Sequence, residues 1–164
     1  MDDQPDFDRF VETHAPALLR LAYASSGDAH LAEDLVQQVL IRAHGRWRLI
    51  DSMAQPHAYL RQMVVHELAS WRRRWQQRRT VLTTVPERPA PDAMTAIDDR
   101  ALCEALLARL PGKQRLVLAL RYLDDVPDDE IARLVGCSEG TVRSHASRGL
   151  ATLRAQQRRS DLDD

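Results

Sequence analysis

The chain has 164 residues, a formal net charge of -1 and a hydrophobic fraction of 44%, the composition of one globular domain or of two small ones. Its two cysteines are too few for a disulfide framework, so a reducing compartment is expected. No apolar run approaches the roughly twenty residues of a membrane span, and the acidic N-terminus lacks the basic start of a signal peptide. The composition therefore excludes disulfide scaffolds and membrane proteins and predicts a cytoplasmic protein.

Three amphipathic helices are predicted in the first half of the chain. The first begins near Phe7 and is broken by the Ser-Ser-Gly-Asp sequence at 25–28. The last residue of that sequence, Asp28, is a good N-cap for the second helix, in which apolar residues recur every four positions from Leu31 to Trp47. Pro56 is suited to the start of the third helix.

A proline-bearing segment follows these helices. Residues 80–97 hold three prolines and show no helical period, which is typical of an extended linker. Leucine-rich helices are predicted on both sides of Pro111-Gly112, and no alternating strand pattern occurs anywhere in the chain. We therefore predict an all-α fold of two small helical domains, residues 1–79 and 98–164, joined by an extended linker at 80–97.

Positive charge is concentrated on arginine, because Lys113 is the only lysine. Guanidinium groups stay ionised and hold phosphate in a two-pronged geometry, although Arg-rich codon usage in a GC-rich genome explains the excess equally well. Their placement is more informative than their number. Five arginines cluster between Arg72 and Arg79, and a second basic stretch runs from Arg143 to Arg159.

A helix-turn-helix is predicted between Pro127 and Arg154. Pro127 suits a first helical position, and the acidic residues after it favour a helix start. Gly136 suits the left-handed conformation that ends a helix, and Ser138 caps the next helix. An ordinary αα-hairpin with a solvated polar face produces the same pattern. Side chains that could reach bases and phosphates in a major groove are Ser138, Glu139, Thr141, Arg143, Ser144, Ser147 and Arg148.

The segment "DDEIARLVGCSEGTVRSHASRGLATLR", preceded by "ALLARLPGKQRLVLALRYLDDVP", resembles region 4 of the extracytoplasmic-function (ECF) sigma factors of the sigma-70 superfamily. Those proteins show an acidic-Ile-Ala step, a Gly turn, a Thr-Val pair and an Arg-Gly or Arg-Ala step before Leu-Arg. All occur here in order, and the Ser147–Leu150 step is similar to the SigE-like subfamily. The resemblance covers residues 7–79 and 98–157. It implies a non-catalytic subunit that directs RNA polymerase to promoters and reads the minus-thirty-five element with the last helix.

The segment "DAHLAEDLVQQVLIRAHGRW" resembles the region 2 helix that docks on the coiled coil of the polymerase's largest subunit. The resemblance places Asp34, Gln37, Gln38 and Arg42 on or near this docking surface. An exposed polar face with both charge signs is suited to a charged helical pair. The residues alone leave open a merely solvated helix face.

The segment "PHAYLRQMVVHELASWRRRWQQRR" resembles the helix that melts and reads the minus-ten element. Trp71 and Trp75 bracket arginines, which combines stacking surface with phosphate attraction. Trp71 lies on the apolar stripe and is expected to be buried, so Trp75 is the better DNA candidate. Many relatives have Asn at His66 and Trp at Tyr59, so the family's base preference does not carry over. The resemblance assigns these residues to minus-ten DNA: Tyr59, Arg61, His66, Arg72, Arg73, Arg74 and Trp75.

Two other functional classes fit parts of the sequence. Six histidines would suit metal or acid–base chemistry, but none shows ligand spacing such as His-Glu-x-x-His, so no catalytic residue, metal site or cofactor is predicted. A stand-alone helix-turn-helix regulator explains the second domain but leaves the arginine-tryptophan helix without a role. The predicted partners are core RNA polymerase and promoter DNA, both duplex and melted. The sequence leaves open whether the two domains pack together or are held by an anti-sigma factor.

Overall fold

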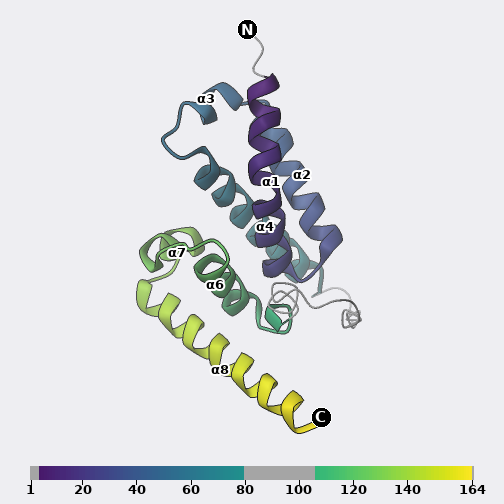
Figure 1. Cartoon of the computed structure of the whole chain (residues 1–164), viewed down its shortest axis with the longest axis vertical. Helices are drawn as coiled ribbons and strands as arrows, with labels where there is room; N and C mark the ends of the chain where they lie inside the picture. Colours follow the sequence, from purple (N-terminus) through teal and green to yellow (C-terminus); the bar gives the residue numbers. More distant parts are fainter. Residues whose placement is uncertain (1–3, 80–105, 164) are drawn as a thin grey trace.

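The structure, a computed structural model, describes residues 4–79 and 106–163. All regular secondary structure in these ranges is helical, which confirms the predicted all-α class. The predicted linker lies among the residues that are not described. The first domain occupies one end of the molecule and the second domain the other, as Figure 1 shows. The first domain contains α1 (Gln4–Ser26), α2 (Ala29–His44), α3 (Trp47–Asp51) and α4 (Pro56–Arg79), and the second contains α6 (Gly112–Tyr122), α7 (Asp128–Val135) and α8 (Glu139–Asp163).

Local signals in the sequence set several helix ends as predicted. The extended Asp28 accepts a hydrogen bond from the Leu31 backbone N–H at 3.1 Å, and α4 begins at Pro56. Gly136 ends α7 with a φ of 73°, and the Ser138 hydroxyl accepts from the Thr141 N–H at 3.1 Å. These caps satisfy backbone groups that a helix end leaves unpaired.

Three predicted boundaries were wrong. The second helix does not continue to Trp47, because the chain leaves the helical conformation at Gly45-Arg46 and then forms the separate helix α3. Pro127 precedes α7 in an extended conformation instead of occupying its first turn. The last helix extends beyond Arg154 to Asp163. A periodic pattern identifies the buried face of a helix and does not locate its first or last residue.

Aromatic packing explains the break before α3. The Trp47 ring is buried against Phe7 of α1, edge-on at 5.1 Å between ring centroids, and it also contacts Phe10. Trp47 therefore contributes to the predicted apolar core, although it reaches this core from α3. The same cluster holds Val39 and Leu60, so α1, α2, α3 and α4 form one packed unit.

The two domains share a second apolar core. Leu21 of α1 and Leu68 of α4 belong to the same buried cluster as Leu107, Leu110 and the residues at 116–120. In the second domain α6 packs on α8 and α7, while across the boundary α1 contacts α6 and α4 contacts α7. The sequence left the relative arrangement of the two domains open, and in the structure the two domains pack together.

Candidate functional site

The outer face of α2 carries the residues predicted to bind the polymerase. Asp34, Gln37, Gln38 and Arg42 are all exposed, whereas the intervening Leu35, Val36 and Val39 are buried. The Arg42 guanidinium pairs with the Glu67 carboxylate of α4. This face is continuous, because the four side chains recur at three- and four-residue spacings.

Sequence reasoning missed one member of this face. Ile41 is 65% exposed and lies seven residues after Asp34, hence on the same side of α2. The sequence did contain a sign of its exposure, because Ile41 does not belong to the apolar residues that recur every four positions from Leu31. Because an exposed isoleucine among charged groups adds apolar contact area, the α2 face combines charge with a small hydrophobic spot.

The residues predicted to contact minus-ten DNA lie on two opposite sides of α4. Tyr59 and His66 line an open groove between α2 and α4 that also contains Met63 and Ile41. Arg61 lies about 200° around the helix from Tyr59, since each residue advances by about 100°. The structure therefore does not bring these predicted DNA contacts together on one surface.

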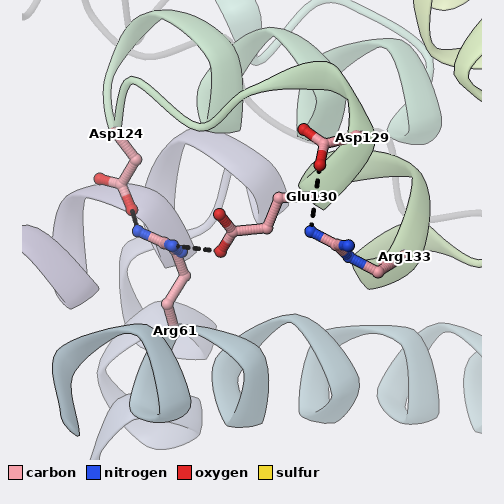
Figure 2. A network of polar contacts seen from close by, with 5 residues as sticks. All are labelled: Arg61, Asp124, Asp129, Glu130 and Arg133. Carbon is pink, nitrogen blue, oxygen red and sulfur yellow. Dashed lines mark hydrogen bonds and ion pairs between the residues drawn. The ribbon is translucent and has the colours of Figure 1, made fainter. Parts of the chain in front are cut away.

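Arg61 points toward the second domain, where two carboxylates surround its guanidinium (Figure 2). Its Nη2 donates to Oε1 of Glu130 at 2.6 Å, and its Nη1 lies 3.8 Å from Oδ2 of Asp124. The Arg61 side chain is only 11% exposed. Burial raises the pKa of Asp124, and the nearby Arg61 opposes that rise.

Arg72 lies on the same side of α4 as Arg61, eleven residues further along. Its Nη2 donates to the backbone carbonyl of Ser25 at 2.6 Å, and burial lowers the pKa of its guanidinium. A Cβ atom placed on Gly112 of α6 would lie 3.0 Å from the Arg72 Cζ atom. Arg72 is therefore confined where the first and second domains meet.

The C-terminal end of α4 exposes the remaining members of the predicted minus-ten set. Arg73 and Arg74 are exposed, with the Arg74 Nη1 donating to the Ser70 hydroxyl at 3.1 Å. Trp75 is 40% exposed and stacks on Trp71 with 5.8 Å between the ring centroids. Trp71 is half-buried against the shared core, so the expectation of a buried Trp71 was only partly right.

The first turns of α8 expose a polar face that begins at the turn after α7. Thr141, Arg143, Ser147 and Arg148 are exposed, and Ser144 is half-buried. The exposed Ser138 hydroxyl caps the helix and lies 2.9 Å from the Thr141 hydroxyl. Arg143 pairs loosely with the exposed Glu139 at 3.7 Å. The structure thus brings the predicted minus-thirty-five residues together on one helix face.

Membrane-spanning helices and metal sites were also considered within the described residues. None of the helices described is long and apolar enough to cross a bilayer. Within residues 4–79 and 106–163, no three histidine, cysteine or acidic side chains gather in a group that could hold a metal ion.

Comparison with known proteins connects the two domains with two family regions. The family model for Sigma-70 region 2 matches residues 10–79, and that for Sigma-70, region 4 matches residues 101–153. The RNA polymerase sigma-E factor of Streptomyces coelicolor is 36% identical over 99% of this chain and 92% of its own length. The ECF RNA polymerase sigma factor SigL of Mycobacterium tuberculosis is 35% identical over 87% of this chain and 84% of its own.

A solved structure has a similar architecture. It is a chain from the co-crystal structure of the sigma factor RpoE in complex with the anti-sigma factor NepR from Bartonella quintana. The likeness has a TM-score of 0.71 and 25% identity, and it covers 93% of this chain and 97% of the other. With two family regions in order and relatives matched along nearly their whole length, the chain belongs to the ECF family of RNA polymerase sigma factors.

Proposed function

We propose that this chain binds core RNA polymerase through its first domain and directs it to promoters by contacting minus-ten and minus-thirty-five elements. The observation that carries the proposal is the simultaneous exposure of two polar helix faces, on α2 and on α8, each within its own matched family region. In this proposal the first domain spans residues 1–79, the linker residues 80–97 and the second domain residues 98–164.

The α2 face suits docking on another helical surface. Asp34 and Arg42 provide opposite charges, Gln37 and Gln38 provide amide hydrogen bonds, and Ile41 provides apolar area. Opposite charges on one face favour a single orientation of a charged partner, because like charges brought together are unfavourable. This combination supports a protein interface better than it supports DNA binding, where positive charge dominates.

The α8 face suits a DNA major groove. Arg143 and Arg148 are long, exposed cations, and Thr141 and Ser147 supply short hydroxyl groups between them. An α-helix fits the major groove, where arginine and hydroxyl side chains can contact base edges and phosphates. Ser138 helps indirectly in this proposal, because its hydroxyl is engaged in capping the helix.

In the proposed minus-ten contact, α4 supplies an exposed end and a groove. Arg73, Arg74 and Trp75 present guanidinium groups and a ring, which together attract phosphate and stack on unpaired bases. Tyr59 and His66 line the groove between α2 and α4. In the described structure Arg61 pairs with Glu130 of the second domain, and the Arg72 guanidinium lies against Gly112 of that domain. Their proposed DNA contacts therefore require the second domain to move away.

The proposed role is that of a specificity subunit without catalytic groups or a cofactor, acting in the cytoplasm beside the polymerase. An anti-sigma factor is included among the proposed partners, because the similar solved structure contains NepR bound to its sigma factor. A stand-alone regulator remains the competing function for the α8 face.

Run-off transcription with purified core polymerase on a library of promoter fragments tests the proposal. We expect initiation from a subset of fragments only when the chain and the core are both present. Initiation from no fragment, with a chain shown to be folded, would contradict the proposal. Tight binding of promoter duplex by the chain alone would favour the regulator.

A further inference from the structure

The boundary between the two domains has an apolar centre. Leu21, Val65 and Leu68 of the first domain are almost fully buried in a cluster that also contains Leu107 and Leu110. Apolar side chains on one side of this boundary would meet water if the second domain moved away. Because exposing apolar surface to water is unfavourable, the isolated chain favours the packed arrangement.

Two arginines of α4, Arg61 and Arg72, lie at the edge of this boundary. Arg61 is held by Glu130 at 2.6 Å and lies 3.8 Å from Asp124, and both carboxylates belong to the second domain. Carboxylates and DNA phosphates are both anions that a guanidinium binds with its forked donors. A guanidinium occupied by Glu130 therefore cannot bind a DNA phosphate with the same donors.

Arg72 is confined by the same closure. Its guanidinium donates to the Ser25 carbonyl of the first domain at 2.6 Å, and Gly112 of the second domain lies against its other side. A Cβ atom at Gly112 would lie 3.0 Å from the Arg72 Cζ atom, so a side chain there would make the guanidinium shift. Arg61 and Arg72 lie on one side of α4, so a single movement of the second domain would uncover both.

From these contacts we propose that the free chain adopts a closed form in which the second domain covers Arg61 and Arg72. In this form the Glu130 carboxylate occupies the Arg61 guanidinium in place of a DNA phosphate. The inference rests on the proposed function, in which α4 contacts minus-ten DNA. In this closed form, single-stranded DNA competes with the second domain for α4. In this proposal core polymerase holds the two domains apart, and its contacts with each domain offset the free-energy cost of exposing the apolar boundary.

The first test removes one charge from the boundary. Glu130→Gln takes the carboxylate from Arg61, and Asp129→Asn is its matched control. Asp129 lies in the same helical turn but pairs within α7, with Arg133 at 3.2 Å (Figure 2). Both variants change the net charge equally and both remove an acid from the start of α7. A difference between them therefore reports the contact with Arg61.

The second test adds bulk and changes no charge. Gly112→Val places a branched side chain against the Arg72 guanidinium, where a Cβ atom alone would already be 3.0 Å from Cζ. Gly112 is the first residue of α6, at a position where a side chain is compatible with the helix. This variant keeps the experiment informative if Glu130→Gln proves too unstable to purify.

Two measurements on the 164-residue chain and its variants test the proposal. Small-angle X-ray scattering measures its largest dimension, and fluorescence anisotropy measures its affinity for a labelled oligothymidylate of about 16 nucleotides at about 50 mM salt. We expect Glu130→Gln and Gly112→Val to be more extended than the parent and to bind the oligonucleotide about fivefold more tightly, because a larger fraction is open. Asp129→Asn should match the parent in dimension and bind with less than about a twofold change.

The proposal is overturned if both test variants keep the parent's scattering profile and affinity. It is also overturned if they extend without binding more tightly, because the covered arginines would then not be DNA contacts. Neither result depends on polymerase. Run-off transcription by the parent chain therefore shows independently whether the proposed function stands.

Discussion

The Arg61 guanidinium of α4 donates a hydrogen bond to the Glu130 carboxylate of α7 at 2.6 Å, which links region 2 to region 4 across 69 residues of sequence. The pair sits at the edge of an apolar core that both regions share. Its two residues come from segments with different proposed partners, since α4 is assigned to minus-ten DNA and α7 precedes the helix assigned to minus-thirty-five DNA. The ion pair stabilises the packed chain and, in our proposal, at the same time keeps DNA from Arg61 of α4.

Removing the carboxylate of Glu130 should cost more stability than removing that of Asp124. Glu130→Gln leaves the nearly buried Arg61 without its close partner, so we expect the free energy of unfolding to fall by about 1–3 kcal/mol. Asp124→Asn should cost less than about 1 kcal/mol, because burial already disfavours the charged form of Asp124 and its pKa is raised. Urea unfolding followed by circular dichroism measures both. Equal losses would contradict this ranking.

Gly149 allows α8 to approach α6 closely. A Cβ atom on Gly149 would lie 2.7 Å from Cδ1 and 3.3 Å from Cγ of Leu118, whose side chain is buried. We expect Gly149→Ala to lower the free energy of unfolding by about 1–2 kcal/mol, since crowding outweighs the better helix propensity of alanine. Gly140→Ala on the same helix is the control, with only the Ser138 hydroxyl within 4 Å, at 3.8 Å. It should be neutral or stabilising in thermal unfolding.

Stability should fall below about pH 6.5 partly through His14. Burial and the nearby His57 lower the pKa of His14, whose ring stacks on His57 at 5.6 Å. The unfolded chain therefore takes up a proton at His14 before the folded chain does, so stability from this group is present above about pH 6.5 and is lost as pH falls. His14→Phe keeps an aromatic ring, and its Tm should fall less than that of the parent between about pH 7.5 and 5.5. Parallel curves would exclude His14 as the cause.

Asp34 should matter for core polymerase and not for folding. Its side chain is exposed on α2 and belongs to the proposed docking face. We expect Asp34→Ala to weaken binding to purified core by about tenfold, with an unchanged Tm. Glu12→Ala removes the same charge from an exposed position on α1 and should bind like the parent. Surface plasmon resonance with immobilised core distinguishes them, and equal affinities would remove Asp34 from the interface.

Arg143 should matter for promoter use. It is exposed on α8, and its contact with Glu139 at 3.7 Å is too exposed to contribute much to folding. Arg143→Ala should reduce run-off transcription from a responsive promoter by about tenfold, as expected for a lost base or phosphate contact. Arg158→Ala, exposed further along the same helix, serves as the control. If both variants transcribe like the parent, Arg143 is not a promoter contact.

Local chemistry made much of the fold predictable. The caps at Asp28, Gly136 and Ser138 satisfy backbone groups within a few residues of themselves, so their roles follow from the sequence. The same holds for the polar faces of α2 and α8, which follow from helical spacing. Trp47 was misplaced because its partners Phe7 and Phe10 lie some forty residues earlier, and a periodic pattern does not contain such distant contacts.

The sequence by itself determined the helical class, the helix-turn-helix and the order of the two family regions, because each depends on neighbouring residues. Only the tertiary structure decided which arginines of α4 are exposed and which are covered by the second domain. Arg61 and Arg72 have the same chemistry as Arg73 and Arg74, yet the second domain covers the first pair and leaves the second pair exposed. That difference arises from apolar packing and an ion pair between distant segments, which no local pattern encodes.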